Sequence, residues 1–184
     1  MSDNVDQLCR AAQAGDITAA TELLDAFYAR IFAYFRRLCA REEDAADLTQ
    51  KTFAKVWSSI GSFGERSTFS TWIHGIARHV YLDWRRRKDR LEPTNDAWWA
   101  AQPHPQADLV ESITERELAT QLYSLVEKLD EDAREAVHLH YYQELTLHQT
   151  AEVLGVAVST VKYRLRRALD FLKKHVNESK RISN

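Results

Sequence analysis

The three prolines of this chain all fall within one short stretch, at Pro93, Pro103 and Pro105. Proline cannot occupy the interior of a helix without breaking it, and the sequence around these prolines shows no hydrophobic periodicity. We therefore predict an irregular linker over residues 91–110. A chain of 184 residues can form two small domains, which places one in residues 1–90 and the other in residues 111–184.

Both predicted domains show helical periodicity. In the first, Leu24, Phe27, Tyr28, Ile31, Phe35 and Leu38 recur every three or four residues, which places them on one stripe of a helix. Gly15 is expected to end the preceding helix, and Asp16 to cap the next one. Because no β alternation is sustained, we predict an all-α fold. The expected helices cover residues 5–14, 23–38, 44–58, 68–87, 111–129, 131–142, 147–154 and 158–175.

The composition is that of an ordinary folded, soluble protein, with 45% hydrophobic and 28% charged residues. No apolar run approaches the ~20 residues that span a bilayer, and the first residues lack the pattern of a signal peptide. We therefore expect a cytoplasmic protein. Cys9 and Cys39 form no CxxC motif, so free buried thiols are favoured over a disulfide or a metal site.

Positive charge is concentrated in two segments, although the net charge is only −2. One is residues 78–90 and the other is STVKYRLRRAL at residues 159–169, where the cations flank an apolar helix face. Such segregation says more about partners than the total charge does. The basic face of residues 159–169 is expected to meet something anionic.

The second basic segment belongs to LTLHQTAEVLGVAVSTVKYRLRRAL, which has the layout of a helix-turn-helix motif. A short helix carrying Ala151 and Leu154 precedes Gly155, which permits a left-handed turn, and a longer basic helix follows. The start of the second helix in such motifs enters the major groove of DNA. A basic helix alone is as often a solvated surface, but the turn before it favours DNA binding. The outward residues expected to contact DNA are Ser159, Thr160, Lys162, Tyr163, Arg166 and Arg167.

An enzyme is a first alternative. His138, His140 and His148 lie close in sequence, but His138 and His140 are two apart on an expected helix, unlike the i, i+4 pair that binds zinc. Solvated or capping histidines are favoured instead. Without a phosphate-binding loop or a nucleophile motif, we assign no catalytic residue, metal or cofactor.

The segment DAADLTQKTFAKVWSSIGSFGERSTFSTWIHGIARHVYLDWRRR resembles the promoter-melting domain of bacterial RNA polymerase sigma factors. Together with the helix-turn-helix, it makes the chain similar to the compact extracytoplasmic-function (ECF) subgroup. The resemblance covers about residues 20–90 and 115–175 in the family's order. It implies a transcription initiation factor with a sigma2-like and a sigma4-like domain, whose partners are promoter DNA and core RNA polymerase, through its β′ coiled coil and β flap.

The resemblance implies a polymerase-binding face on the helix over residues 44–60. A helical wheel places Leu48, Phe53, Val56, Trp57 and Ile60 inward and a polar face opposite them. By this resemblance, the residues expected to dock on the β′ coiled coil are Asp47, Gln50 and Lys51, with Leu48 and Ala54 beside them.

The loop GSFGERS matches the family's loop that takes up a flipped base of the −10 element. Two glycines let the backbone bend around a base, which an aromatic ring or an arginine can contact. The residues expected at the −10 strand are Phe63 and Arg66 of the loop and, on the next helix, His74, Arg78, Arg85 and Arg86. In the linker, Trp98 and Trp99 are assigned either to anchoring in the polymerase or to covering a domain seam.

Lys51 departs from the family's pattern, in which an acidic residue commonly follows the glutamine of DLxQ. A cation there removes an attraction to the basic β′ coiled coil and adds a repulsion, which is expected to weaken docking. Phosphorylation of Thr52, or less favourably Thr49, would restore negative charge, so a Ser/Thr kinase is one predicted regulator and an anti-sigma factor another.

A conventional dimeric helix-turn-helix regulator is the second alternative. It would account for residues 115–175 equally well. It would leave DLTQKTF and GSFGERSTFSTW without a purpose, which favours the sigma factor.

Overall fold

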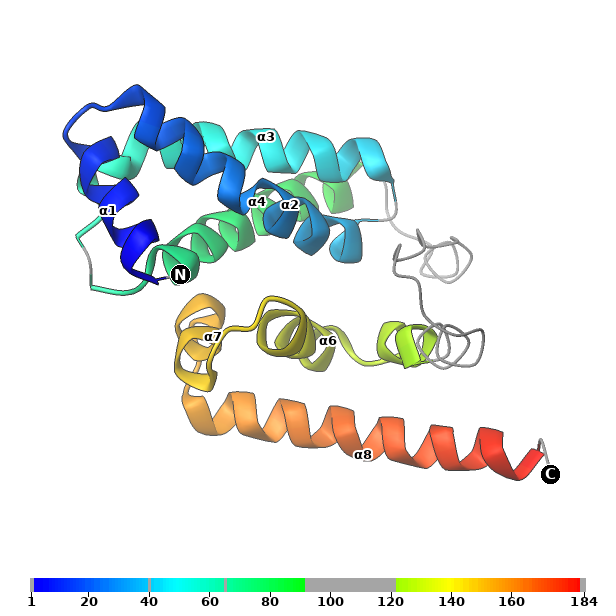
Figure 1. The fold of residues 1–184 in the computed structure, drawn as a ribbon. Coiled ribbons are helices and arrows are strands. Elements are labelled where there is room, and N and C mark those ends of the chain that lie inside the picture. The colour runs from blue at the N-terminus through cyan, green and yellow to red at the C-terminus, as the bar shows by residue number, and fades with distance from the viewer. Residues whose placement is uncertain (1, 40, 65, 92–121, 183–184) are drawn as a thin grey trace. The chain divides into compact units, whose positions relative to one another are not determined.

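The structure is a computed structural model that describes residues 2–39, 41–64, 66–91 and 122–182. The regular elements in these ranges are all helices, and they fall into two compact units (Figure 1). The predicted all-α fold with two helical domains is confirmed. The predicted linker from residue 92 onward, with its prolines and Trp98 and Trp99, lies outside the described residues.

The amino-terminal unit contains α1 (Ser2–Gln13), α2 (Ile17–Leu38), α3 (Glu42–Ser59), the short 3₁₀ helix η1 (Ile60–Ser62) and α4 (Phe69–Leu91). Gly15 has a φ of 94°, which ends α1 in the left-handed conformation expected of glycine. The carboxylate of Asp16 then accepts hydrogen bonds from the N–H groups of Thr18 and Ala19, as an N-cap. Both predicted helix-end signals are therefore confirmed.

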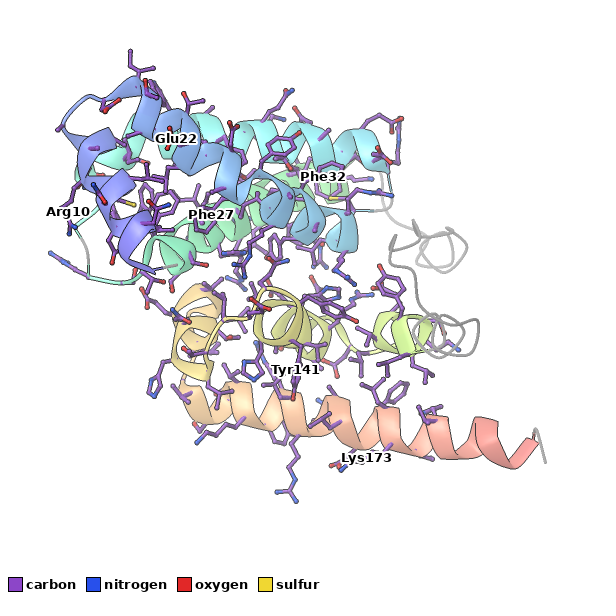
Figure 2. The ribbon with its side chains drawn as sticks, in the orientation of Figure 1. Arg10, Glu22, Phe27, Phe32, Tyr141 and Lys173 are labelled. Carbon is purple, nitrogen blue, oxygen red and sulfur yellow. The ribbon has the colours of Figure 1, made fainter. Side chains whose placement is uncertain are left out.

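The core of this unit lies where α2, α3 and α4 meet. The buried stripe of α2 is Leu23, Phe27, Ile31, Tyr34 and Phe35. It is rotated from the predicted stripe, because Tyr28 is 48% exposed. Phe69 at the start of α4 packs edge-on against Phe27, with ring centroids 5.1 Å apart, and so joins α4 to α2. Phe27 points into this core in Figure 2.

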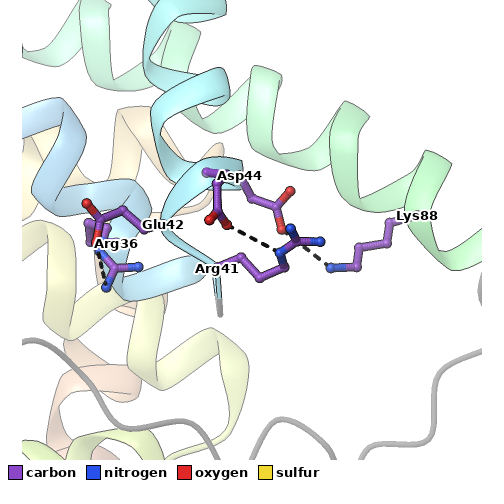
Figure 3. A network of polar contacts seen from close by, with 6 residues as sticks. Arg36, Arg41, Glu42, Asp44 and Lys88 are labelled. Carbon is purple, nitrogen blue, oxygen red and sulfur yellow. Dashed lines mark hydrogen bonds and ion pairs between the residues drawn. The ribbon is translucent and has the colours of Figure 1, made fainter.

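A network of ion pairs links the end of α2, the start of α3 and the far part of α4 (Figure 3). Arg36 lies 3.8 Å from Glu42, Arg41 lies 3.4 Å from Glu43, and Lys88 lies 3.7 Å from Asp44. The thiol of Cys39 is buried beside these charges. Burial, with a smaller contribution from Asp44, raises the pKa of Cys39 to about 12, so the thiol stays protonated at neutral pH. Cys9 and Cys39 are both free and buried, as predicted.

The carboxy-terminal unit contains a helix over residues 122–127, α6 (Glu131–Val137), its π-helical continuation η3 (His138–Tyr142), α7 (Leu147–Leu154) and α8 (Val158–Ile182). α6 packs against α8, and the core includes Leu139, Val161, Leu165 and Ala168. The predicted bounds of α7 are those observed. In the part of the chain that the structure describes, no helix has an apolar stretch of membrane-spanning length.

The two threonines predicted as phosphorylation sites both lie in the core of the amino-terminal unit. Thr49 and Thr52 are 0% exposed, and their hydroxyls donate to the carbonyl oxygens of Ala45 and Leu48, one helical turn earlier. A kinase must reach the hydroxyl that it modifies. Both hydroxyls are inaccessible in this structure, which counts against the predicted modification site at Thr52 or Thr49.

We expect Thr52→Glu to destabilise the protein by about 3–5 kcal/mol, because it places an unpaired carboxylate in the core. Ala54→Glu is the matched control, since it adds the same charge two residues along α3 on the exposed side and should cost at most about 0.5 kcal/mol. Urea denaturation of both variants measures the difference. Equal stabilities would show that Thr52 is accessible after all.

Candidate polymerase and promoter interfaces

The exposed side of α3 carries most of the residues predicted to bind polymerase. Asp47, Gln50, Lys51 and Ala54 are all exposed and lie within two helical turns of one another. Leu48 is not part of this surface, because it is 0% exposed and packs in the core beneath it. We call the four exposed residues the α3 face.

The two charges of the α3 face pair with each other. Nζ of Lys51 donates a hydrogen bond to a carboxylate oxygen of Asp47, one turn earlier on the helix, and both side chains are about half exposed. An exposed pair of this kind contributes little to stability. Its main consequence is electrostatic, because Lys51 neutralises the carboxylate that the α3 face would otherwise present.

An aromatic patch beside the α3 face was missed from the sequence. Tyr28 of α2 stacks on Phe32 and on Phe53 of α3, at centroid distances of 6.3 and 5.8 Å, and Trp57 is 50% exposed. The prediction that Trp57 packs inward is therefore wrong. Hydrophobicity alone could not have shown that these rings face outward, although large exposed aromatic groups commonly mark binding surfaces.

The loop between η1 and α4 is exposed at Gly64 and Arg66, and Gly61 of η1 is exposed just before it. Phe63, predicted to stack on a base, is instead 7% exposed, with its ring 5.0 Å from that of Trp72 and 5.8 Å from that of Phe69. Its position in this aromatic cluster corrects the prediction. Of the two loop residues predicted to meet DNA, only Arg66 is exposed, and the backbone at Gly64 is exposed beside it.

Of the α4 residues predicted to meet DNA, the arginines are at least partly exposed, whereas the histidine is buried. His74 is 0% exposed, its Nδ1–H donates to the carbonyl oxygen of Ser70 at 2.7 Å, and its ring packs against Tyr34. The prediction that His74 faces DNA is therefore wrong, since the ring belongs to the core. Arg78 and Arg85 are half-buried, and Arg86 is exposed and forms an ion pair with Asp83 at 3.2 Å.

The helix-turn-helix predicted from the sequence is present in α7 and α8. Gly155 has a φ of 67°, and the N–H groups of Gly155 and Val156 donate to the carbonyl oxygens of Glu152 and Ala151. This is the Schellman arrangement that ends a helix with a left-handed residue. The predicted DNA-facing residues that are exposed on α8 are Ser159, Lys162, Tyr163, Arg166 and Arg167, whereas Thr160 is half-buried.

Two arginines of α8 are held by acids at the start of α6. Arg164 is largely buried and pairs with Asp132 at 2.6 Å, and Arg167 pairs with Asp130 at 3.2 Å. Asp130 is also the N-cap of α6 and accepts from the N–H of Ala133. Arg167 additionally lies 5.8 Å from the ring of Tyr163. Lys162 and Arg166 therefore carry the basic charge on this part of α8 that no ion pair described in the structure neutralises.

An apolar groove of about 520 Å³ lies between the helix over residues 122–127, η3 and the second half of α8. Its lining includes Leu122, Val126, Tyr141, Leu169 and Lys173, of which Tyr141 and Lys173 are labelled in Figure 2. Leu122, Tyr141 and Leu169 are 40–52% exposed. This surface, which we call the α8 groove, has the size and apolar character of a binding site.

The three histidines considered for zinc are not arranged as a metal site. His138 is buried and lies 3.8 Å from a carboxylate oxygen of Glu127, whereas Nδ1–H of His140 donates to the carbonyl oxygen of Leu145. Among the described residues, no three His, Cys, Asp or Glu side chains are close enough to share a metal ion.

The two units match two family descriptions in order along the chain. Residues 23–91 match Sigma-70 region 2, and residues 119–172 match Sigma-70, region 4. RNA polymerase sigma factor YlaC of Bacillus subtilis (strain 168) is 30% identical over 160 residues, covering 86% of this chain and 92% of YlaC. ECF RNA polymerase sigma factor SigW of the same strain is 29% identical over 173 residues, covering 89% of this chain and 92% of SigW.

Solved structures show the same fold. CnrH, in complex with the cytosolic domain of CnrY, aligns with a TM-score of 0.68 over 97% of this chain and 99% of CnrH, at 22% identity. The sigma factor RpoE from Bartonella quintana, in complex with the anti-sigma factor NepR, aligns with a TM-score of 0.68 over 85% of this chain and 96% of RpoE, also at 22% identity. The chain thus belongs to the extracytoplasmic-function group of the sigma-70 family of RNA polymerase sigma factors, which are promoter-directing transcription initiation factors and not enzymes.

Proposed function

We propose that this chain binds core RNA polymerase through its amino-terminal unit, contacts the −10 element with the same unit, and contacts the −35 element with α8. One observation carries the proposal: region 2 and region 4 occur in one chain, and each presents exposed polar or basic residues where the family places a partner. Neither unit alone would give a factor that both holds polymerase and reads two promoter elements.

The α3 face and the aromatic patch together form the proposed polymerase surface. Asp47, Gln50, Lys51 and Ala54 supply polar groups and a small residue that permits close approach. Tyr28 and Trp57 supply the large aromatic area that interfaces favour. The occupant is the β′ coiled coil of core polymerase.

The proposed −10 surface consists of the loop after η1 and the basic side chains of α4. Arg66 and the exposed backbone at Gly64 would meet an unpaired base, and Arg78, Arg85 and Arg86 would meet the phosphates of the strand. Phe63 and His74 support this surface from within the core. They do not contact DNA in this proposal.

The proposed −35 surface is the first half of α8. Ser159, Lys162, Tyr163 and Arg166 project from the helix that follows the glycine turn, where the second helix of the motif enters the major groove. Thr160 and Arg167 lie at the edges of this surface. Arg167 would have to exchange Asp130 for a phosphate in order to bind DNA.

The α8 groove is the proposed site for the β flap of core polymerase. An apolar groove bordered by helices is suited to the apolar face of a short helix from a partner. An anti-sigma factor, as in the complex of RpoE with NepR, is a further proposed partner of this chain.

A sigma factor binds a promoter only in complex with core RNA polymerase, whereas a conventional regulator binds its DNA site alone. We expect the full chain to co-elute with core RNA polymerase in size-exclusion chromatography, and to protect specific duplex DNA only in that complex. The DNA is selected from a randomised library with the complex. A chain that ignores core polymerase and protects a specific site alone would instead be the dimeric helix-turn-helix regulator.

We expect Lys51→Glu to increase the affinity for core polymerase by about tenfold, because it removes a cation and releases the carboxylate of Asp47 toward the basic β′ coiled coil. Arg10→Glu makes the same change of charge on the exposed surface of α1 and serves as the control. Fluorescence anisotropy with labelled protein measures both. An unchanged affinity for Lys51→Glu, or an equal gain for Arg10→Glu, would contradict a docking role for the α3 face.

Arg166 and Arg164 should differ in their effect on DNA binding. Arg166→Ala is expected to weaken binding of the complex of the full chain with core polymerase to promoter duplex DNA, and to reduce the salt dependence by about one ion, because an exposed phosphate contact is lost. Arg164→Ala should leave the salt dependence unchanged, since Arg164 is occupied by Asp132. The affinities of both variants for DNA, measured over a series of salt concentrations, give the salt dependence of each. An equal decrease for both arginines would rule out the assigned faces of α8.

A further inference from the structure

The side chain of Gln13, the last residue of α1, reaches the segment that follows α3. Its Nε2 donates hydrogen bonds to the carbonyl oxygen of Ile60 at 3.2 Å and to that of Phe63 at 2.6 Å. A side-chain amide has two N–H groups, so this contact uses both of them. The amide thus bridges the two ends of a turn that lies 47 and 50 residues away in the sequence.

This bridge adds to other contacts that fix the backbone of the turn, among them a hydrogen bond from the hydroxyl of Ser62 to the carbonyl oxygen of Ser59 at 2.7 Å. The N–H of Phe63 donates to the carbonyl oxygen of Ile60 at 3.0 Å, and the ring of Phe63 is packed in the aromatic cluster. Gly61 lies two residues before Phe63 and Gly64 directly after it, and a Cβ added at either glycine would meet nothing within 4 Å. No close contact therefore requires glycine at either position, and the freedom of glycine raises the entropy that is lost when the turn is ordered.

The exposed part of the loop begins directly after the bridge. Gly64 and Arg66 follow Phe63, and the loop ends at Thr68, whose hydroxyl accepts from the N–H of Thr71 at 3.2 Å. The segment is therefore held at one end by Gln13 and Phe63 and at the other by the start of α4. Loss of the Gln13 contact would leave the carbonyl groups of Ile60 and Phe63 without this donor, at the end of the segment that leads to Arg66.

We propose that Gln13 is a positioning residue for the loop that meets the −10 element. It orders the backbone at Ile60 and Phe63, so that the exposed residues after them are held ready for an unpaired base. This rests on the proposed function of the loop. Gln13 precedes the residues that match Sigma-70 region 2, which begin at residue 23, so the role belongs to α1 of this chain.

The test compares Gln13→Met, which keeps the length of the side chain but cannot donate, with Ala12→Gly, which weakens the same end of α1 and keeps the amide. Two quantities are measured for each full-length variant. One is the hydrogen exchange of the amides over residues 60–64 in the free chain. The other is the affinity of the complex with core polymerase for the unpaired −10 strand, relative to its affinity for the −35 duplex.

For Gln13→Met we expect exchange to become about five- to tenfold faster and the relative affinity for the unpaired strand to fall by about the same factor, because two hydrogen bonds are lost. Binding of core polymerase and of the −35 duplex should be unchanged. Ala12→Gly should change the relative affinity by less than twofold. Equal losses in the two variants would reduce Gln13 to a structural role and overturn the proposal.

Failure of the proposal and failure of the proposed function give different results. Faster exchange with an unchanged relative affinity would show that the bridge exists but does not position a DNA-binding loop. Unchanged exchange would show that Gln13 does not order the turn. A wild-type complex that does not bind the unpaired strand would refute the function proposed for the loop itself, whatever the exchange data show.

Discussion

The aromatic contacts of Phe69 organise the amino-terminal unit. Its ring packs edge-on against Phe27 of α2 and Phe63 of the loop, with centroids 5.1 and 5.8 Å away. Through these two contacts, one residue at the start of α4 joins the core of the unit to the loop proposed to meet DNA. Aromatic pairs of this geometry contribute beyond the area that they bury. The position of the loop therefore depends on the same packing that stabilises the fold.

The surfaces proposed on α3 and α8 are each the outer side of a helix whose inner side is in the core. α3 buries Leu48, Thr52 and Val56, so the residues on its other side, from Asp47 to Ala54, are left for a partner. α8 buries Val161, Leu165 and Ala168 and presents Lys162 and Arg166. This division explains why buried Thr52 lies directly beside exposed Lys51, a residue of the proposed docking surface.

Local signals in the sequence predicted the backbone well. Gly15, Asp16 and Gly155 marked helix ends because only a few residue types favour those conformations, and the structure has each of them in its expected role. The bounds of α7 followed from the same signals. Patterns of this kind depend only on residues within a few positions of one another. They can therefore be recognised in a single sequence without knowledge of the tertiary structure.

The side on which a particular ring lies was less predictable. Phe63 and His74 were expected at DNA and are buried, whereas Trp57 was expected in the core and is half exposed. A helical wheel leaves residues at the boundary of the apolar stripe undecided, and tertiary packing decides them. The pairing of Arg164 with Asp132 and the bridge from Gln13 to Phe63 join residues 32 and 50 positions apart, so no local pattern announces them.

The central claim is that this chain gives core RNA polymerase a promoter specificity that the core polymerase lacks by itself. The most direct measurement is transcription of total bacterial DNA by core polymerase, with and without the full chain, followed by sequencing of the 5′ ends of the transcripts. With the chain, transcripts should start at a discrete set of sites that share two sequence elements at a fixed spacing upstream. The same start sites with and without the chain would contradict the claim.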